Sequence, residues 1–238
     1  MDNDCAIRNE WKAAQYCHTI ARAYNTKTDV LNDRVIISTE LSLSAVFIQR
    51  ILDIKACWTI YADGCMDINL EVIKNKEFPY LPRFGLRMFL PEDMDKVTYC
   101  GIGPVESYID KKWAGYHGVF SSDARDMHED YLRPQENGSH YDCDYVTLSD
   151  GTFGLAAVSE TPFSFQASRY TQEELERAAH NYELKKSDSI VLCIDYAQNG
   201  IGSNSCGPEV MDIYKFDDES FGFRFRLVPS VNGILQKL

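Results

Sequence analysis

A glycine-rich segment near the end of the chain places several small polar side chains in succession. The run Gly200-Ile201-Gly202 continues into Ser203, Asn204, Ser205 and Cys206. The run looks like a phosphate-binding loop, but it lacks the lysine of that motif, and Pro208 interrupts any helix after it. Glycine and asparagine favour tight turns, so one interpretation is a simple turn between strands. The other is that Ser203 to Cys206 reach toward a ligand or a neighbouring domain.

A second polar site surrounds Glu106, which lies among aromatic residues in the segment 101–108. A carboxyl group in such surroundings could act as a general acid. Carboxylates that leave water more often pair with a cation, and Arg83 and Arg133 are the candidate partners. We therefore expect Glu106 and Arg133 to be either structural residues or polar groups on the sugar side of a site.

Gln135 and Glu136 stand beside the turn Asn137-Gly138. They could hydrogen-bond a sugar, or they could lock two loops together. Glycoside hydrolysis needs two carboxyl groups at a defined separation across one cleft. Acidic residues are plentiful in this chain, but no pattern in the sequence places two of them in that way, so no catalytic residue is predicted.

Metal-binding and nucleophile motifs are weak or missing. His140, Asp142 and Cys143 loosely imitate the spacing of metal ligands, but a second clustered pair is missing, and we expect no metal site. The sequence has no GxSxG, HExxH or Walker A motif.

Composition narrows the possible partners and the compartment. With 24 basic and 36 acidic residues the net charge is −12, which argues against nucleic acid and anionic membranes as partners. Eight cysteines without a CxxC pair predict a reducing, cytoplasmic location, and Cys57, Cys100 and Cys193 fall in apolar runs typical of a core. The chain shows neither a secretory signal nor an apolar run long enough for a membrane helix.

Period-2 patterning predicts an all-β protein. The expected strands cover 34–43, 45–52, 56–62, 66–72, 84–90, 96–100, 145–148, 153–159, 163–167 and 221–227. Asp63-Gly64 is a hairpin signal, and the capping box Thr171 to Glu174 predicts a helix that stops before Ser187. A shorter helix is expected around Trp11. One or two short helices beside many strands favour a β-sandwich, which we interpret as a single domain over 1–238.

Four of these segments, in this order, resemble one family. The segments 82–85 (PRFG), 101–111 (GIGPVESYIDK), 131–138 (YLRPQENG) and 195–208 (DYAQNGIGSNSCGP) resemble the PRxG, GxGPxExYxDR, YxxPQExG and DxxQxGxGxxSxxP stretches of glycoside hydrolase family 2 beta-galactosidases. The start of the chain, DND followed by WKAA, is similar to the opening of the C-terminal domain in that family. The resemblance covers nearly the whole chain.

The resemblance implies an antiparallel supersandwich of the galactose mutarotase type. It implies a parent enzyme that hydrolyses terminal β-D-galactosides such as lactose with retention of configuration. The catalytic glutamates, the magnesium and the sodium of that enzyme belong to other parts of it, so this fragment is expected to contain no cofactor and to be inactive alone. Its expected partners are the catalytic barrel domain, or the large chain, and the galactoside at the rim.

Under this resemblance, Ser203 to Cys206 would complete the rim of the active site. Some members have a tryptophan that stacks on the aglycone sugar where Cys206 stands here, and a thiol has no stacking face. Asp144 occupies a position that is basic in many members. Two alternatives remain open: an aldose mutarotase-like enzyme that uses His117 or His140 with Glu106 or Glu136, and a stand-alone carbohydrate-binding module. An apolar surface that faces the barrel would favour homo-oligomers of the isolated chain.

Overall fold

The computed structural model describes residues 4–202, 207–232 and 234–235. Its strands within these residues are β1 Ile20–Val30, β2 Arg34–Ser44, β3 Leu52–Tyr61, β4 Met66–Lys74, β5 Arg83–Pro91, β6 Lys96–Gly103, β7 Tyr116–Asp123, β8 Ser139–Ser149, β9 Phe153–Ser168, β10 Ser189–Gln198, β11 Ser220–Val231 and β12 Ile234–Leu235. Two six-residue α-helices, α1 Arg8–Ala13 and α2 Gln172–Arg177, lie beside them. Short 3-10 turns cover Tyr16–His18, Ala124–Met127, Asn181–Glu183 and Asp212–Tyr214.

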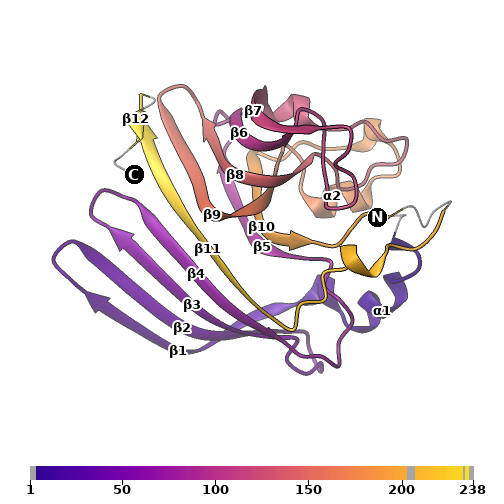
Figure 1. Cartoon of the computed structure of the whole chain (residues 1–238), viewed down its shortest axis with the longest axis horizontal. Coiled ribbons are helices and arrows are strands. Elements are labelled where there is room, and N and C mark those ends of the chain that lie inside the picture. Colours follow the sequence, from indigo (N-terminus) through magenta and orange to yellow (C-terminus); the bar gives the residue numbers. More distant parts are fainter. Residues whose placement is uncertain (1–3, 203–206, 233, 236–238) are drawn as a thin grey trace.

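All the strand pairs are antiparallel, and they follow one path through the sheet. The order is β1-β2-β3-β4-β11-β9-β8-β6-β7, with β10 joining β9 to β5 and β12 pairing with β11. The long strand β9 links the two parts, because its residues 153–158 pair with β11 while its residues 164–168 pair with β10. The curved layer of β1 to β4 and β11 thus meets a second group of strands (Figure 1). This arrangement confirms the predicted antiparallel fold with few short helices.

Aromatic residues of β11 join the two layers. Phe221, Phe223 and Phe225 are buried on one face, as their alternation predicted. The ring of Phe221 lies 5.0 Å from that of Phe84 on β5 and 4.6 Å from that of Tyr196 on β10. One part of the core therefore lies between the curved layer and the strands β5 and β10, and the same cluster of buried residues extends to β6, β8 and β9.

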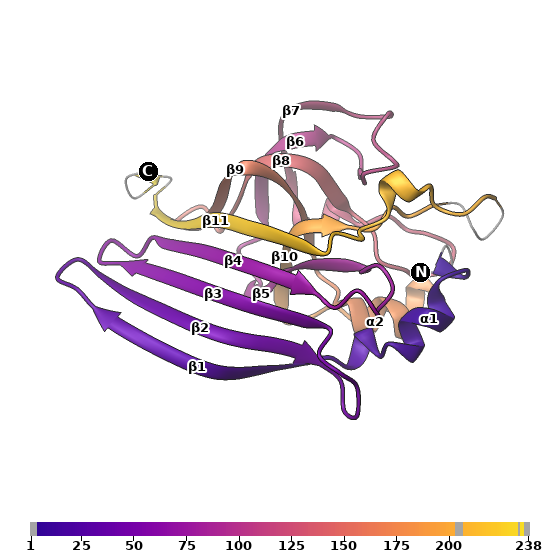
Figure 2. The ribbon, with the colours of Figure 1, turned by 60° about the horizontal axis from the view of Figure 1, so that its bottom comes forward.

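The opposite face of the curved layer is polar. Arg226 on β11 donates to Asp67 on β4, and Arg224 donates to Asn69 at 2.9 Å. Figure 2 shows β1 to β4 and β11 side by side in this layer. The hairpin between β3 and β4 turns at Asp63-Gly64, as predicted, with Gly64 at a φ of +87° that favours glycine.

Several details of the sequence prediction were wrong, and β7 and β10 were missing from the expected strands as well as β1. Residues 45–51 form a turn and an irregular stretch rather than a strand, and β1, which has exposed residues along both faces, was not foreseen. Thr171 accepts from the backbone N–H of Glu174 as predicted, but α2 ends at Arg177 instead of continuing toward Ser187. The Glu174 carboxylate pairs with Arg177. The residue after the helix, Ala178, is extended.

Among the described residues, no helix is long and apolar enough to cross a membrane.

The four motif segments converge at one end of the second strand group. Arg83 begins β5, Gln198 ends β10, and these two residues face each other in the ladder. The segment after β6 and the segment before β8 lie at the same end, because Ser107 N–H donates to the carbonyl of Ser139 at 2.7 Å.

Candidate functional site

A buried ion pair forms the base of this region. Arg83 Nε donates to Asp195 Oδ1 at 3.1 Å, and a second guanidinium nitrogen bonds Oδ2, so the pair is bidentate. Asp195 is 2% exposed. A β-bulge after Asp195 shifts the register of β10 against β5. Gly85 leaves the space for the carboxylate, since a Cβ at Gly85 would lie 2.3 Å from Asp195 Oδ1. The sequence PRFG thus supplies both the cation and the gap.

Glu136 is the second partner of Arg83. The two side chains form an ion pair that ties the segment before β8 to β5. Burial by itself would lower the pKa of Arg83, but Asp195 and Glu136 raise that pKa well above its ordinary value. Burial raises the pKa of Asp195, and Arg83 opposes this shift. Glu136 therefore fits the predicted lock between two loops.

Glu106 is held by three donors from two of the motif segments. Its carboxylate accepts from Lys111 and from the Tyr131 hydroxyl, and Gly138 N–H donates to Oε2 at 2.8 Å. Burial would raise the pKa of Glu106, but these hydrogen bonds hold it below its ordinary value of 4.5. The partner of Glu106 is thus Lys111, and the pairing with Arg83 or Arg133 suggested by the sequence is wrong for Arg83, which binds Asp195 and Glu136 instead.

Asp110 fixes the start of the glycine-rich segment. Its two carboxylate oxygens accept from the backbone N–H groups of Ile201, at 3.0 Å, and Gly202, at 2.7 Å. A Cβ at Gly200 would lie 3.0 Å from the carboxyl carbon of Asp110, so the backbone passes close to this side chain. Gly202 has a φ of +59°, in the left-handed region that glycine tolerates best. The chain entering the loop is therefore held by one carboxylate.

The remaining predicted site residues are Arg133, Gln135 and the rim loop, and the structure describes only the first two. Arg133 is exposed, and the backbone carbonyl of Gln135 accepts from Asn137 Nδ2 at 2.9 Å. The rim loop Ser203, Asn204, Ser205 and Cys206 lies outside the described residues. Its proposed role in the rim stays a prediction.

Asp110, Lys111 and Asp195 were not singled out from the sequence, although all three stand inside the motif segments. The signal available was only that each is a charged residue inside a motif segment, and charged residues are common on any surface. Only the folded chain brings Asp110 to residues 201 and 202, about ninety positions away.

His140 and Cys143 belong to the interior. His140 is 2% exposed, with its ring 5.2 Å from that of Phe165 and 4.4 Å from that of Tyr99. Burial lowers the pKa of His140 from 6.5 to about 4 and raises that of the fully buried Cys143 thiol. His140 and Cys143 therefore contribute to the packing of the interior. Of the three strand cysteines predicted as core, Cys193 is buried, while Cys57 and Cys100 are only half-buried.

The region contains locked carboxylates rather than a free acid and base. Glu106, Glu136 and Asp195 each accept from a cation of the protein itself. A hollow of about 780 Å³ lies elsewhere, over β1 to β4 and β11, beside Tyr24, Arg50 and Glu71. In the described part of the motif region, the carboxylates of Glu106, Glu136 and Asp195 are paired with the protein's own cations, unlike the two facing carboxyl groups that glycoside hydrolysis uses. The described part of this region is thus a set of carboxylates that accept from Arg83, from Lys111 and from the backbone at residues 201 and 202.

Comparison with known proteins shows the family to which this chain belongs. Residues 1–227 match the family described as beta galactosidase small chain. The chain belongs to the beta-galactosidase small chain family. It is 42% identical over 95% of its length to the beta-galactosidase of Actinobacillus pleuropneumoniae, and 34% identical over 95% to that of Staphylococcus xylosus. It spans only 22% and 23% of those relatives.

The architecture of this small chain recurs in a solved structure of distant sequence. A galactose 1-epimerase from Lactobacillus acidophilus matches with a TM-score of 0.52 and 10% identity, over 87% of this chain and 66% of that one. The likeness concerns the fold alone, and it supports the galactose mutarotase-like architecture expected from the resemblance.

Proposed function

We propose that this chain is the C-terminal sandwich, or small chain, of a retaining beta-galactosidase that hydrolyses terminal β-D-galactosides. The observation that carries the proposal is the 42% identity over 95% of the chain to a beta-galactosidase of which it covers 22%. The catalytic glutamates would lie in a barrel outside this chain. Against that barrel, the chain would pack and present the loop Ser203 to Cys206 at the rim.

The geometry supports a rim rather than a catalytic role. Asp110 holds the loop at Ile201 and Gly202, and Glu106 and Arg83 hold the segments beneath it. A loop that contacts a substrate must be fixed at its base, because a small displacement of a positioning group costs much of the rate. Held in this way, the loop would bind the aglycone side of a galactoside.

We place the magnesium and sodium of the parent enzyme outside this chain. Hard cations require free carboxylate or carbonyl oxygens. Around the loop base, Glu106, Glu136 and Asp195 are already neutralised by Lys111 and Arg83. These residues do not fit a second cation.

A chimera tests the proposal. The segment of the Actinobacillus pleuropneumoniae beta-galactosidase that matches this chain is replaced by residues 1–238, and hydrolysis of a chromogenic galactoside is measured. We expect turnover by the chimera and none by the purified chain. The same enzyme with the segment deleted serves as the control and should lose most of its activity. A correctly assembled but inactive chimera would contradict the proposal, as would hydrolysis that stays with the lone chain through successive purification steps.

An aldose mutarotase activity has little support in the geometry. That chemistry requires a histidine acid and a glutamate base facing one sugar ring. His140 is buried between aromatic rings, and the side-chain partner of His117 is Asp144, at 3.5 Å. Glu106 and Glu136 are held by Lys111 and Arg83. Polarimetry with fresh α-galactose should therefore show no acceleration of mutarotation by this chain.

A stand-alone carbohydrate-binding module is the other alternative. All three aromatic residues of β11 are buried in the core and offer no stacking platform. Calorimetric titration with galactose and lactose is expected to give no saturable heat in the absence of the barrel. Saturable binding at millimolar sugar would favour the module instead.

A further inference from the structure

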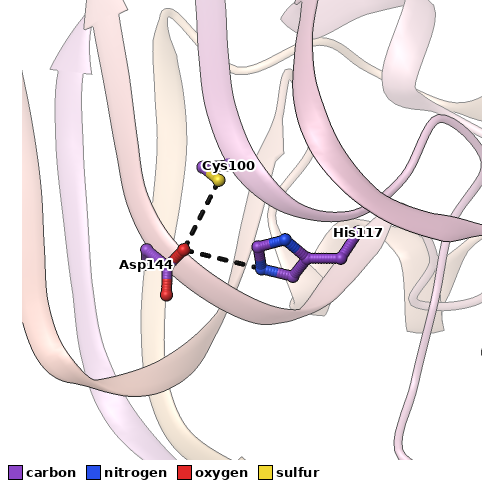
Figure 3. A group of neighbouring side chains, drawn as sticks. All are labelled: Cys100, His117 and Asp144. Carbon is purple, nitrogen blue, oxygen red and sulfur yellow. Dashed lines mark hydrogen bonds and ion pairs between the residues drawn. The ribbon is translucent and has the colours of Figure 1, made fainter.

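Three side chains with metal-binding chemistry meet on the outer face of three neighbouring strands. Cys100 lies on β6, His117 on β7 and Asp144 on β8, and β6 pairs with both of the other strands. Their ligand atoms all lie within 4.8 Å of one another. Figure 3 shows the three side chains turned toward a common point. All three lie outside the four motif segments, and Cys100 immediately precedes the segment 101–111.

Two distances within this cluster match those around a tetrahedral ion, and the third, between Cys100 and His117, is at most 4.8 Å. Cys100 Sγ lies 3.4 Å from Asp144 Oδ2, and His117 Nε2 lies 3.5 Å from the same oxygen. For zinc bonds of about 2.3 Å to sulfur and about 2.0 Å to nitrogen or oxygen, tetrahedral angles separate neighbouring ligand atoms by roughly 3.3–3.6 Å. Asp144 Oδ2 therefore lies at the spacing that a shared ion would require from both Cys100 Sγ and His117 Nε2.

The arrangement does not fit a nucleophilic triad. In such a triad the histidine stands between the nucleophile and the carboxylate. Here Asp144 stands between the other two, and both of the contacts drawn in Figure 3 end on its carboxylate. Burial and the nearby Asp144 carboxylate raise the pKa of the Cys100 thiol, whereas an attacking cysteine needs a lowered one.

The backbone of β8 explains why Asp144 faces outward here. Cys143 and Val146 are both fully buried although they are three residues apart, so the strict alternation of the strand fails between them. The ladder between β8 and β9 changes register on both sides of Cys143, and Asp142 has a φ of +58°. Irregularities of this kind re-aim side chains and occur next to functional sites. Asp144 is thereby presented to Cys100 from a fixed sheet rather than from a loop.

We propose that Cys100, His117 and Asp144 bind a divalent transition-metal ion of the zinc class, with water at the fourth position. A thiolate and an imidazole select zinc and its neighbours over magnesium, calcium or sodium, which prefer oxygen ligands. On binding, Cys100 loses its thiol proton to solvent and its sulfur bonds the metal. The exposed side chains of His117 and Asp144 leave a path for the ion to enter.

This site differs from the weak pattern that the sequence offered. The residues His140, Asp142 and Cys143 are close in sequence, but they do not gather. Among the residues that the structure describes, the one group of three with suitably placed ligand atoms is that of Cys100, His117 and Asp144. Its members are up to 44 positions apart, so the spacing could not reveal it.

A metal at this position would stabilise the edge strand β7. β7 ends the strand order and, within the part of the chain that the structure describes, pairs only with β6. An ion bound by residues of β7, β6 and β8 would cross-link this edge strand to the two strands behind it. Because the site exists only in the folded chain, the ion would raise the melting temperature.

The test uses Co²⁺ alone as a spectroscopic probe of the full 238-residue chain under reducing conditions. We expect one equivalent of Co²⁺ to produce a thiolate-to-cobalt charge-transfer band, and equimolar Zn²⁺ to displace it. Loss of an outer partner of a ligand already costs about 10–100-fold in affinity, so Cys100→Ser, His117→Gln and Asp144→Asn should each weaken Co²⁺ binding by at least about 100-fold. A rise in melting temperature with Zn²⁺ should disappear in the same three variants.

Matched controls separate this site from adventitious binding. Cys57→Ser removes another half-buried strand cysteine, and His180→Gln removes an exposed histidine that lies 3.1 Å from Glu183. Both variants should bind Co²⁺ as the parent chain does. The proposal is overturned if the parent chain gives no charge-transfer band, or if the band survives Cys100→Ser and is lost in a control. Near-ultraviolet circular dichroism of each variant shows whether a lost charge-transfer band reflects a lost ligand or a lost fold. A folded Cys100→Ser variant that still binds one Co²⁺ would also overturn the proposal.

Discussion

The carboxylate of Asp110 accepts a hydrogen bond from the backbone N–H of Gly202 at 2.7 Å, 92 positions further along the chain. Its other oxygen accepts from Ile201 at 3.0 Å. Through these two bonds, a residue just beyond β6 fixes the point where the glycine-rich segment leaves β10. The relationship joins two of the four motif segments and provides the base on which the proposed rim loop stands.

Asp110→Asn should loosen this base. An amide keeps one acceptor oxygen but turns an NH₂ group toward the second backbone N–H, so one of the two hydrogen bonds is lost. We expect the free energy of unfolding to fall by about 1–2 kcal/mol in urea titration. Asp188→Asn, at an exposed position, is the matched control and should change it by less than about 0.5 kcal/mol. Equal effects of the two substitutions would contradict the anchoring role.

Arg83→Met should be among the most destabilising changes of a charged residue. It leaves Asp195, which is 2% exposed, without its cation, and a buried pair broken on one side typically costs about 3–5 kcal/mol. Arg87→Met on the same strand breaks an exposed pair with Glu173 and should cost less than about 1 kcal/mol. Chemical denaturation of both variants checks the difference, and a small loss for Arg83→Met would show that Asp195 is solvated or neutral.

Gly85→Ala tests the gap beside Asp195. A Cβ at Gly85 would stand 2.2 Å from the carbonyl oxygen of Ile194 and 2.3 Å from Asp195 Oδ1, so either β5 or β10 must shift. The expected loss is about 1–3 kcal/mol or more. At Gly222 on β11, the nearest atom would be 3.8 Å away, and Gly222→Ala should be neutral or slightly stabilising. Thermal melts of the two alanine variants give the comparison.

Glu106 should contribute to acid unfolding. Its pKa in the folded chain lies below the ordinary 4.5, so the stabilisation is present above pH 4.5 and is lost as the pH falls through the folded value. Urea titrations between pH 3 and 6 should show stability falling with pH, with a shallower fall in Glu106→Gln. The exposed Glu176→Gln serves as the control and should retain the slope of the parent chain. An unchanged slope in Glu106→Gln would contradict the assigned hydrogen bonds.

His140 should make stability depend on pH in a higher range than Glu106 does. Its pKa is about 4 in the folded chain against 6.5 in the unfolded one, so the unfolded chain binds the extra proton between these values. Stability should therefore decline as the pH falls from about 6.5 to about 4, by up to roughly 1.4 kcal/mol per pH unit. His140→Phe should remove this decline and remain folded. The carbonyl of Ile102, which His140 contacts at 3.3 Å, keeps a hydrogen bond from Ser107 Oγ at 2.9 Å.

The sequence predicted the strands with strong local signals. The alternation of Phe221, Phe223 and Phe225 and the turn at Asp63-Gly64 appear in the structure as expected, because a strand with one dry face must alternate. It failed at β1, whose residues are almost all exposed, so no apolar period marks the strand. It also extended α2 too far, since an apolar stripe cannot show that the chain leaves the helix at Ala178.

For the site too, some features follow from local sequence patterns and others only from the packing of distant strands. The amino-acid sequence by itself determined the sign of the charge, the all-β class and, through four ordered motifs, the family, because composition, strand period and short glycine turns are local properties. Only the tertiary structure decided that Glu106 binds Lys111 rather than Arg83, that Asp110 holds Gly202, and that Cys100, His117 and Asp144 share one point. Such contacts depend on strand register and bulges, and these are fixed when distant strands pack together.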